Sequence, residues 1–183
     1  NYNKKVNEFY LSLGSNIGNR EHNLSKAINS LFSSSALSNG EYIQIERVSS
    51  LYESLAISNI EQPKFLNIAL KISSELDSLE LLKIAKTIES DFGRNLVEVN
   101  KPRIIDIDII LMKSMGNHVM VDLQEHNGLL QIPHPRAHLR AFVLMPLIEI
   151  EPELTHPILN KTLKEILIDL DKQDIDKLNS ISY

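Results

Sequence analysis

The chain of 183 residues contains no cysteine. This absence excludes disulfide bonds, zinc–thiolate sites, iron–sulfur clusters and cysteine nucleophiles. It fits a reducing compartment, and we expect the cytoplasm. Basic residues are not in excess, because 19 Lys and Arg stand against 24 Asp and Glu. The sequence therefore lacks an overall electrostatic footprint for nucleic acid. It also lacks an apolar run of the roughly 18 residues that a membrane span needs, so neither nucleic acid nor membrane is expected as a partner.

The start of the chain, from Asn1 to Lys5, lacks both a methionine and the apolar region of a signal peptide. A length of 183 residues suits one domain with its own core. The composition, with 43% hydrophobic and 23% charged residues, is typical of a globular protein. We therefore expect a single domain over residues 1–183, with a piece cut from a longer polypeptide as the alternative.

The spacing of apolar residues predicts the order of the secondary structure elements. Strands are expected over 9–13, 43–52, 65–72 and 104–112, and helices over 20–34 and 76–91. This β-α-β-β-α-β order indicates an α+β fold with a ferredoxin-like core, arranged as three layers, α/β/α. Additional C-terminal elements are expected: a short hairpin near 119–121, helices over 142–150 and 162–170, and a loosely held tail after Lys172. Residues 53–63 and 95–102 read as long loops.

Two aspartates, Asp106 and Asp108, stand in the most strand-like run of the chain. Residues two apart on a strand share a face, so the carboxylates point the same way, with Cα atoms about 7 Å apart. The alternate residues from Ile105 to Leu111 then face a core. Neighbouring carboxylates need a compensating charge, and Mg²⁺ binds one or two carboxylates together with waters and substrate phosphates. The pattern favours a magnesium site, with a solvated face paired to Lys or Arg as the alternative.

Arginine is concentrated in one part of the sequence. Four of the six arginines lie between residues 94 and 140, with two histidines among them: Arg94, Arg103, Arg136, Arg140, His134 and His138. Guanidinium groups bind phosphate oxygens in a bidentate manner, so we expect a polyphosphate site, with solvated surface arginines as the alternative. Pro133 and Pro135 restrict the backbone around His134. That histidine lies either in a structural turn or beside a nucleotide.

An aromatic ring and an amide share one face of another expected strand. Phe65 and Asn67 are two residues apart, and together they suit a planar heterocycle with hydrogen-bonding edges. Packing in the core is the alternative for Phe65, and Phe142 has the same two readings. Glu89, near the end of the second expected helix, reads as a surface charge when it is considered alone.

In this order and spacing, the motifs resemble the 6-hydroxymethyl-7,8-dihydropterin pyrophosphokinase family of folate biosynthesis. The resemblance runs from about Tyr10 to Pro157 and is carried by residues 11–16, 50–54, 62–67, 92–94, 102–108 and 132–142. It implies transfer of diphosphate from ATP to the pterin hydroxymethyl group, with AMP as the other product. It also implies that the chain is one pyrophosphokinase domain, which in this family occurs fused to, or associated with, another folate enzyme.

The resemblance assigns roles to individual residues. It implies that Asp106 and Asp108 hold two Mg²⁺ ions and that Arg94 and Arg103 act with them in catalysis. The implied ATP-binding residues are Glu89, Arg94, Arg103, Ile109, His134 and Arg140. The implied pterin-binding residues are Ser54, Ile57, Phe65, Asn67 and Phe142.

The sequence departs from the family pattern in its two expected loops. Leu55 and Ala56 stand where the family usually has proline, and Asn100-Lys101-Pro102-Arg103 replaces an aromatic-Gly-Pro-Arg run. Two rival functions remain at this point. A nucleotidyl transferase would need a third carboxylate on a neighbouring strand, and a ferredoxin-like ligand-sensing module would not need both aspartates.

Overall fold

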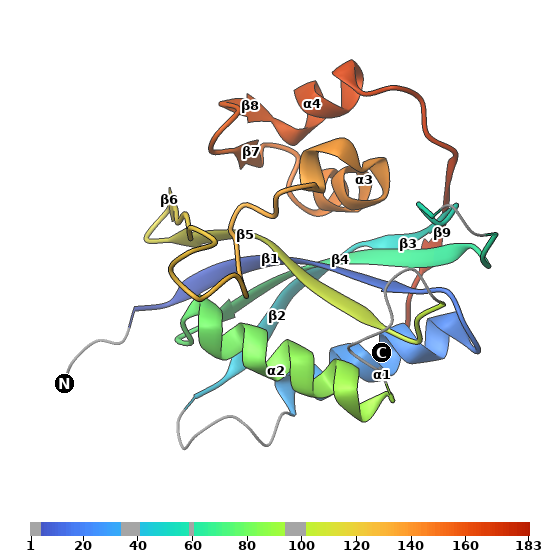
Figure 1. The fold of residues 1–183 in the computed structure, drawn as a ribbon, viewed down its shortest axis with the longest axis horizontal. Helices are drawn as coiled ribbons and strands as arrows, with labels where there is room; N and C mark the ends of the chain where they lie inside the picture. The colour runs from blue at the N-terminus through green and yellow to red at the C-terminus, as the bar shows by residue number, and fades with distance from the viewer. Residues whose placement is uncertain (1–4, 34–40, 59–60, 94–101) are drawn as a thin grey trace.

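A computed structural model describes residues 5–33, 41–58, 61–93 and 102–183 of the chain (Figure 1). The strands are β1 (Asn7–Ser15), β2 (Ile43–Val48), β3 (Ser50–Ser54), β4 (Phe65–Ser74), β5 (Asp106–Ser114), β6 (Asn117–His118), β7 (Thr155–His156), β8 (Lys161–Thr162) and β9 (Ile175–Ser180). The helices are α1 (Arg20–Phe32), α2 (Ser78–Asp91), α3 (Ala141–Ile150) and α4 (Leu163–Asp169), with a short 3₁₀ helix at Ala137–Leu139.

One antiparallel sheet forms the middle layer of the structure. Its strand order is β6-β5-β1-β4-β3-β9, and β2 also pairs with β4. Helices α1 and α2 cover one face of this sheet, and α3 and α4 lie over the other (Figure 1). The predicted α+β fold with three layers is therefore confirmed, and in the predicted β-α-β-β-α-β order β2 and β3 together take the place of one expected strand. Among the described residues, no helix is both long enough and apolar enough to cross a membrane.

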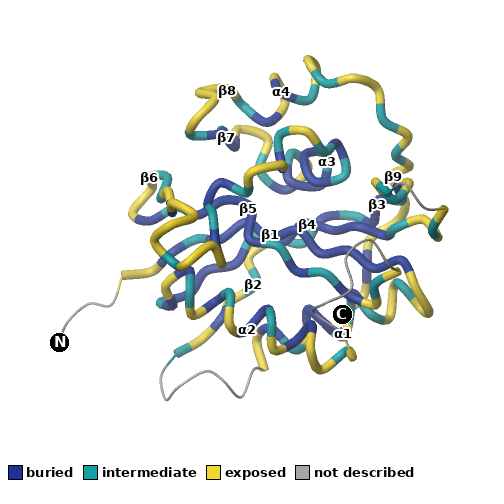
Figure 2. Tube along the Cα trace, in the orientation of Figure 1, coloured by how far each residue is buried: buried dark blue, intermediate teal, exposed yellow. Residues whose placement is uncertain are grey.

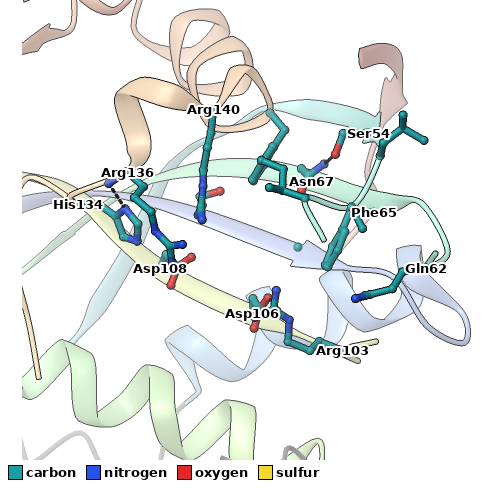
Figure 3. A pocket seen from close by; sticks show the side chains of 16 residues that line it. Ser54, Gln62, Phe65, Asn67, Arg103, Asp106, Asp108, His134, Arg136 and Arg140 are labelled. Atoms are coloured by element: carbon teal, nitrogen blue, oxygen red, sulfur yellow. Dashed lines mark hydrogen bonds and ion pairs between the residues drawn. The ribbon is translucent and has the colours of Figure 1, made fainter. Parts of the chain in front are cut away.

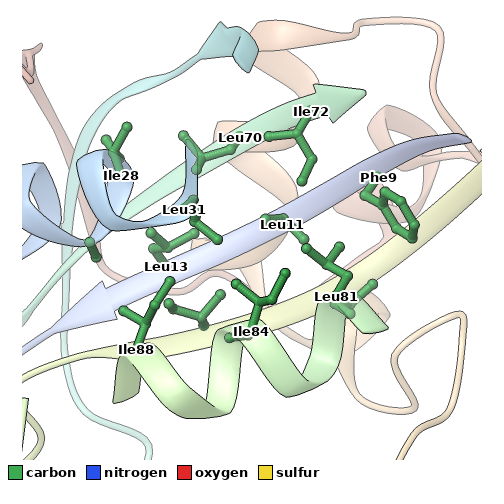
Figure 4. Close-up of a cluster of buried hydrophobic side chains, with 14 of the residues drawn as sticks. Phe9, Leu11, Leu13, Ile28, Leu31, Leu70, Ile72, Leu81, Ile84 and Ile88 are labelled. Carbon is green, nitrogen blue, oxygen red and sulfur yellow. The ribbon is translucent and has the colours of Figure 1, made fainter. Parts of the chain in front are cut away.

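Burial follows the layers, with buried residues along the strands and on the helix faces that touch them (Figure 2). On α1 the buried residues are Leu24, Ala27, Ile28 and Leu31, at the three- and four-residue spacing of one helix face. A capping box of Asp77 and Glu80 starts α2. Leu81, Ile84 and Ile88 of α2 pack beneath the β1 side chains (Figure 4). Each such buried side chain contributes about 1.5–3 kcal/mol relative to an exposed one.

The structure corrects the expected facing of β5 after its midpoint. Tyr10 lies opposite Leu111 and Leu11 lies opposite Ile109, so Ile110 is an extra residue in β5. This bulge reverses the alternation of side chains. The predicted grouping of Leu111 with Ile105 is wrong, because Ile105 packs below the sheet with α1 and α2, whereas Leu111 packs above it with α3.

Three further expectations change in detail. The expected strand over 43–52 is two strands, separated at Ser49, whose hydroxyl accepts the Ala69 N–H at 2.8 Å. The hairpin after β5 turns at Met115 and Gly116, earlier than expected. The prediction of a loosely held tail is wrong, because residues 175–180 form β9 and pair with β3. The expected loop over 95–102 lies almost entirely outside the described residues.

Candidate active site

A cleft of about 300 Å³ opens on the sheet face that carries α3 (Figure 3). This volume is at the lower end of the range for small-molecule sites. Its lining residues are Ser12, Gly14, Ser54, Leu55, Ala56, Ile57, Gln62, Phe65, Asn67, Arg103, Asp106, Asp108, His134, Arg136, Arg140 and Phe142. The apolar part of the same sheet face, which includes Tyr10 and Ala69, is packed against α3. The cleft therefore occupies the polar part of the face, next to the start of α3.

Strand register places the polar residues of the cleft side by side. Asp106 lies opposite Gly14 on β1, and Gly14 lies opposite Asn67 on β4. One step along, Asp108 lies opposite Ser12. Residues directly opposite each other share a face of the sheet, so both carboxylates and the Asn67 amide face one cleft, as the alternation of the sequence predicted for the aspartates.

Asn67 forms the floor of one end of the cleft. Its side chain is buried, and its Nδ2 donates to Ser54 Oγ at 2.8 Å and to the Tyr52 carbonyl at 3.2 Å. These bonds fix the plane of the amide. Gly14 gives Phe65 and Asn67 room to lie against β1, because a Cβ on Gly14 would come within 3.2 Å of Asn67 Oδ1 and 3.3 Å of Phe65 Cδ1. A flat slot beside Phe65 is the result.

Arg103 connects this slot with the carboxylates. Its Nε lies 3.0 Å from Asp106 Oδ2, and its guanidinium carbon lies 5.8 Å from the centre of the Phe65 ring. The arginine therefore reaches both the aromatic slot and the carboxylate pair. It also supplies part of the positive charge that two neighbouring carboxylates require.

Asn16 holds together two chain segments that border the cleft. Its Oδ1 accepts the Arg103 N–H at 2.6 Å, and its Nδ2 donates to Gln62 Oε1 at 3.1 Å and to the Pro63 carbonyl at 3.2 Å. The backbone N–H of Asn16 donates to the Arg103 carbonyl at 3.1 Å. The sequence analysis gave Asn16 no role of its own, since its partners are 46 to 87 positions away in the chain.

His134 and Arg140 form the opposite wall. The His134 N–H donates to the carbonyl of Ile110, the bulged residue of β5, at 2.9 Å. Burial lowers the pKa of the His134 imidazole; Asp108 opposes this shift, and the guanidinium groups of Arg140 and Arg136 add to it. The imidazole is therefore neutral near pH 7. Its Nδ1 accepts the Arg136 N–H at 3.2 Å, so Nε2 carries the proton and is a donor.

Arg140 and Phe142 enter the cleft from the start of α3. Burial is the main cause of a lowered pKa of Arg140, but a guanidinium remains charged at neutral pH. The guanidinium carbon of Arg140 lies 5.6 Å from the centre of the Phe142 ring. Phe142 is partly buried against the upper core and also lines the cleft; packing in the core is therefore confirmed, and contact with a heterocycle stays a prediction.

Most of the predicted site residues come together in this cleft. Those that line it are Ser54, Ile57, Phe65, Asn67, Arg103, Asp106, Asp108, His134, Arg140 and Phe142. Arg94 lies outside the described residues. Glu89 and Ile109 do not line the cleft; Ile109 is in the core below the sheet, and Glu89 is fully buried beneath β5. The surface reading of Glu89 is wrong, and its assignment to ATP binding, like that of Ile109, stays a prediction.

Some residues of the cleft were missed as site residues. Arg136, Gln62, Ser12 and Gly14 line it. The sequence did contain a signal for Arg136, because this residue belongs to the arginine cluster between residues 94 and 140. The strand alternation that relates Ser12 and Gly14 to the aspartates appears only once the register of β1 against β5 is known.

The donor set of the cleft suits one kind of metal ion. Asp106 and Asp108 are the two carboxylates among the described lining residues, and the described part of the chain holds no cluster of three His, Cys, Asp or Glu side chains able to bind a metal. Two carboxylate side chains are by themselves too few ligands for a structural zinc or calcium site. They do fit Mg²⁺, which takes one or two carboxylates and completes its shell with water and substrate phosphates.

Comparison with known proteins identifies the family. The model of the 7,8-dihydro-6-hydroxymethylpterin-pyrophosphokinase family matches residues 10–152. A relative from Aquifex aeolicus, named 2-amino-4-hydroxy-6-hydroxymethyldihydropteridine pyrophosphokinase, is 41% identical over 156 residues, which cover 85% of this chain and 88% of that protein. The chain belongs to the 7,8-dihydro-6-hydroxymethylpterin-pyrophosphokinase family, as the sequence motifs predicted.

Other similar proteins are much longer than this chain. The folic acid synthesis protein fol1 of Schizosaccharomyces pombe is 36% identical over 91% of this chain, which spans only 21% of that protein. A solved structure of Plasmodium falciparum HPPK-DHPS covers 92% of this chain with a TM-score of 0.66, and the chain spans 46% of it. At 16% identity this likeness shows the fold alone. The expectation that the family occurs fused to other folate enzymes is confirmed for these relatives.

Proposed function

We propose that this chain transfers diphosphate from ATP to the hydroxymethyl group of 6-hydroxymethyl-7,8-dihydropterin and leaves AMP. The observation that carries the proposal is the sheet register: it sets the paired carboxylates of β5 and the aromatic slot of β4 in one cleft, on either side of β1. Membership of the family supports it. The activities and partners of the longer relatives are not part of this proposal.

The slot suits the pterin. Phe65 and Phe142 line the same cleft from β4 and from α3, where a planar heterocycle can stack against aromatic rings. Asn67 presents an amide that its bonds to Ser54 and Tyr52 hold in one plane. Both amide N–H groups are used in these bonds, so Asn67 would meet the edge of the pterin as an acceptor, through Oδ1.

The cationic wall suits the triphosphate. Arg103, Arg136 and Arg140 bring three guanidinium groups to the cleft, and the neutral His134 adds an N–H donor at Nε2. Guanidinium groups bind phosphate oxygens in a bidentate manner. They stabilise the charge that spreads over the transferred group in the transition state. The family resemblance assigns Arg94 to triphosphate binding as well.

Asp106 and Asp108 would hold the Mg²⁺ ions. Bound there, magnesium would neutralise phosphate charge and orient the transferred group. The protein's own residues position the two substrates. The slot orients the hydroxyl of the pterin, and the guanidinium groups hold the β-phosphate in line with it. Such positioning accounts for a large part of rate acceleration in phosphoryl transfer.

The rival nucleotidyl transferase finds less support in the cleft. That reaction needs a third carboxylate on a strand next to Asp106 and Asp108. The β1 residues opposite them are Gly14 and Ser12, and the described lining residues include no other Asp or Glu. We further propose that residues 1–183 form one pyrophosphokinase domain.

A phosphorus NMR time course with ATP, Mg²⁺ and the pterin tests the reaction. AMP and a pterin diphosphate in equal amounts are the expected products, and none should form without magnesium. ADP in place of AMP would indicate attack at the γ-phosphorus and would contradict the proposal. The variant Glu153→Gln, which changes an exposed carboxylate in the turn after α3, serves as a control with unchanged turnover.

A further inference from the structure

The segment between α4 and β9 lies outside the family match, yet it contacts both walls of the cleft. The match ends at residue 152, and the segment comprises residues 170–174. Its central contact is made by Gln173. This residue does not line the cleft itself, so any effect on substrates must pass through its neighbours.

The Gln173 amide binds the backbone on both sides of Arg140. Its Oε1 accepts the Ala141 N–H at 2.9 Å, and its Nε2 donates to the Leu139 carbonyl at 3.0 Å. Arg140 is the N-cap residue of α3, and its own side chain makes no capping hydrogen bond. A distant glutamine therefore satisfies the first N–H of this helix, a group that a helix leaves without an internal partner.

Two residues after Gln173, where β9 begins, the chain is anchored at the wall of the cleft that β3 forms. Ile175 opens β9 and pairs with Ser54, the last residue of β3. Ser54 in turn accepts the hydrogen bond that orients the Asn67 amide. Residues 173–175 thus bridge from the turn that carries Arg140 and Phe142 to the strand that carries the Asn67 partner.

We propose that Gln173 is a positioning residue that sets the direction of Arg140 and Phe142 relative to Phe65 and Asn67. A planar amide that donates and accepts at once restrains the backbone on either side of Arg140, and that backbone aims both side chains into the cleft. The inference rests on the proposed function, because it takes Arg140 as a phosphate ligand and Phe142 as a pterin contact.

The test compares Gln173→Met with a matched control. Methionine has a similar length but makes neither hydrogen bond. Gln124→Met changes an exposed glutamine in the turn over 122–128. We expect kcat/KM for the pterin to fall by about tenfold to a hundredfold in Gln173→Met, with a wild-type far-ultraviolet circular dichroism spectrum. Gln173→Glu keeps the acceptor for the Ala141 N–H and should recover part of the loss.

Hydrogen exchange at the Ala141 amide gives a second readout that does not depend on turnover. It should be faster in Gln173→Met than in the wild type and in Gln124→Met. Wild-type protein that makes no AMP would overturn the proposed function, whereas the exchange rates would still decide whether Gln173 holds the turn. Turnover or exchange in Gln173→Met equal to that of Gln124→Met would overturn the inference. If Gln173→Met does not fold, Gln173→Ala, which also removes both hydrogen bonds, takes its place in the same two readouts.

Discussion

Arg103 and Asp106 form an ion pair at the entrance of β5, with Nε 3.0 Å from Oδ2. The Asp106 side chain is only 15% exposed, whereas that of Arg103 is 37% exposed. The arginine is therefore the partner that solvent reaches more easily. In the proposed reaction the two must exchange partners, because phosphate attracts the guanidinium and magnesium attracts the carboxylate.

Replacing either carboxylate by an amide should abolish most of the activity. For Asp106→Asn and Asp108→Asn we expect AMP formation to slow by at least about a hundredfold, since each change removes charge that the cation needs. Raised magnesium should restore part of the rate. The measurement is a titration of turnover against magnesium, with Glu153→Gln as the control. Wild-type rates in both variants would exclude a metal role for the pair.

Asn16→Ala should loosen the cleft and destabilise the fold. The Asn16 side chain is buried and makes three hydrogen bonds. In one of them its Oδ1 accepts the Arg103 N–H. We expect the free energy of unfolding to fall by about 2–4 kcal/mol, because buried polar groups lose their partners. Urea unfolding measures this. Asn29→Ala, at an exposed position on α1, should change stability by less than about 0.5 kcal/mol.

We expect Glu89 to stabilise the protein through its hydrogen bond to β5. Its Oε1 accepts the Ile107 N–H at 2.8 Å, between the two aspartates, and its Oε2 lies 2.9 Å from Lys86 Nζ. We expect Glu89→Ala to lower the free energy of unfolding by about 2–4 kcal/mol, since the buried N–H is left without its acceptor.

Glu89→Gln separates this structural role from the predicted role in ATP binding. Glutamine keeps an acceptor for the Ile107 N–H, so it should lose clearly less stability than alanine does. A normal KM for ATP in Glu89→Gln is the expected result. A raised KM for ATP at unchanged stability would instead assign Glu89 to the nucleotide site directly. Glu21→Ala, on the exposed face of α1, controls for the loss of a carboxylate.

His156 should make the protein less stable in mild acid. Burial lowers the pKa of His156, and the neighbouring His138 and His118 lower it further. Its Nδ1 accepts the Leu159 N–H at 3.3 Å, and its ring meets that of His138 edge-on at 5.8 Å. Because the folded-state pKa lies below the ordinary value of about 6.5, the unfolded state binds more protons below that pH. The free energy of unfolding should therefore fall as the pH drops below about 6.5.

The check compares wild type and His156→Gln at about pH 7.5 and about pH 5.5. Glutamine does not titrate, so the variant should lose less stability between the two values than the wild type does. An equal loss in both proteins would mean that His156 contributes nothing to the acid sensitivity. His126→Gln, in the turn over 122–128, is the matched control outside this histidine group.

Local patterns in the sequence were enough for helices α1 and α2, for strands β1, β4 and β5, and for the face of the carboxylates. The spacing of Leu24, Ile28 and Leu31 predicts α1, and the two-residue spacing of Asp106 and Asp108 predicts their common face. Both patterns depend only on the repeat of a helix or a strand, which a single chain segment determines. The resemblance to the family added the cleft residues that lie on different segments.

Only the tertiary structure decided how the segments meet. The bulge at Ile110 depends on the register of β5 against β1, and it moves Leu111 to the other core. The charged residues of β9 gave no signal for a strand, because edge pairing with β3 uses backbone groups that nearly every residue carries. Asn16 and Gln173 are polar residues of ordinary appearance, and their importance comes from hydrogen bonds to partners 32 to 87 positions away. Such contacts exist only once the sheet and α3 have packed, so no local pattern in the sequence records them.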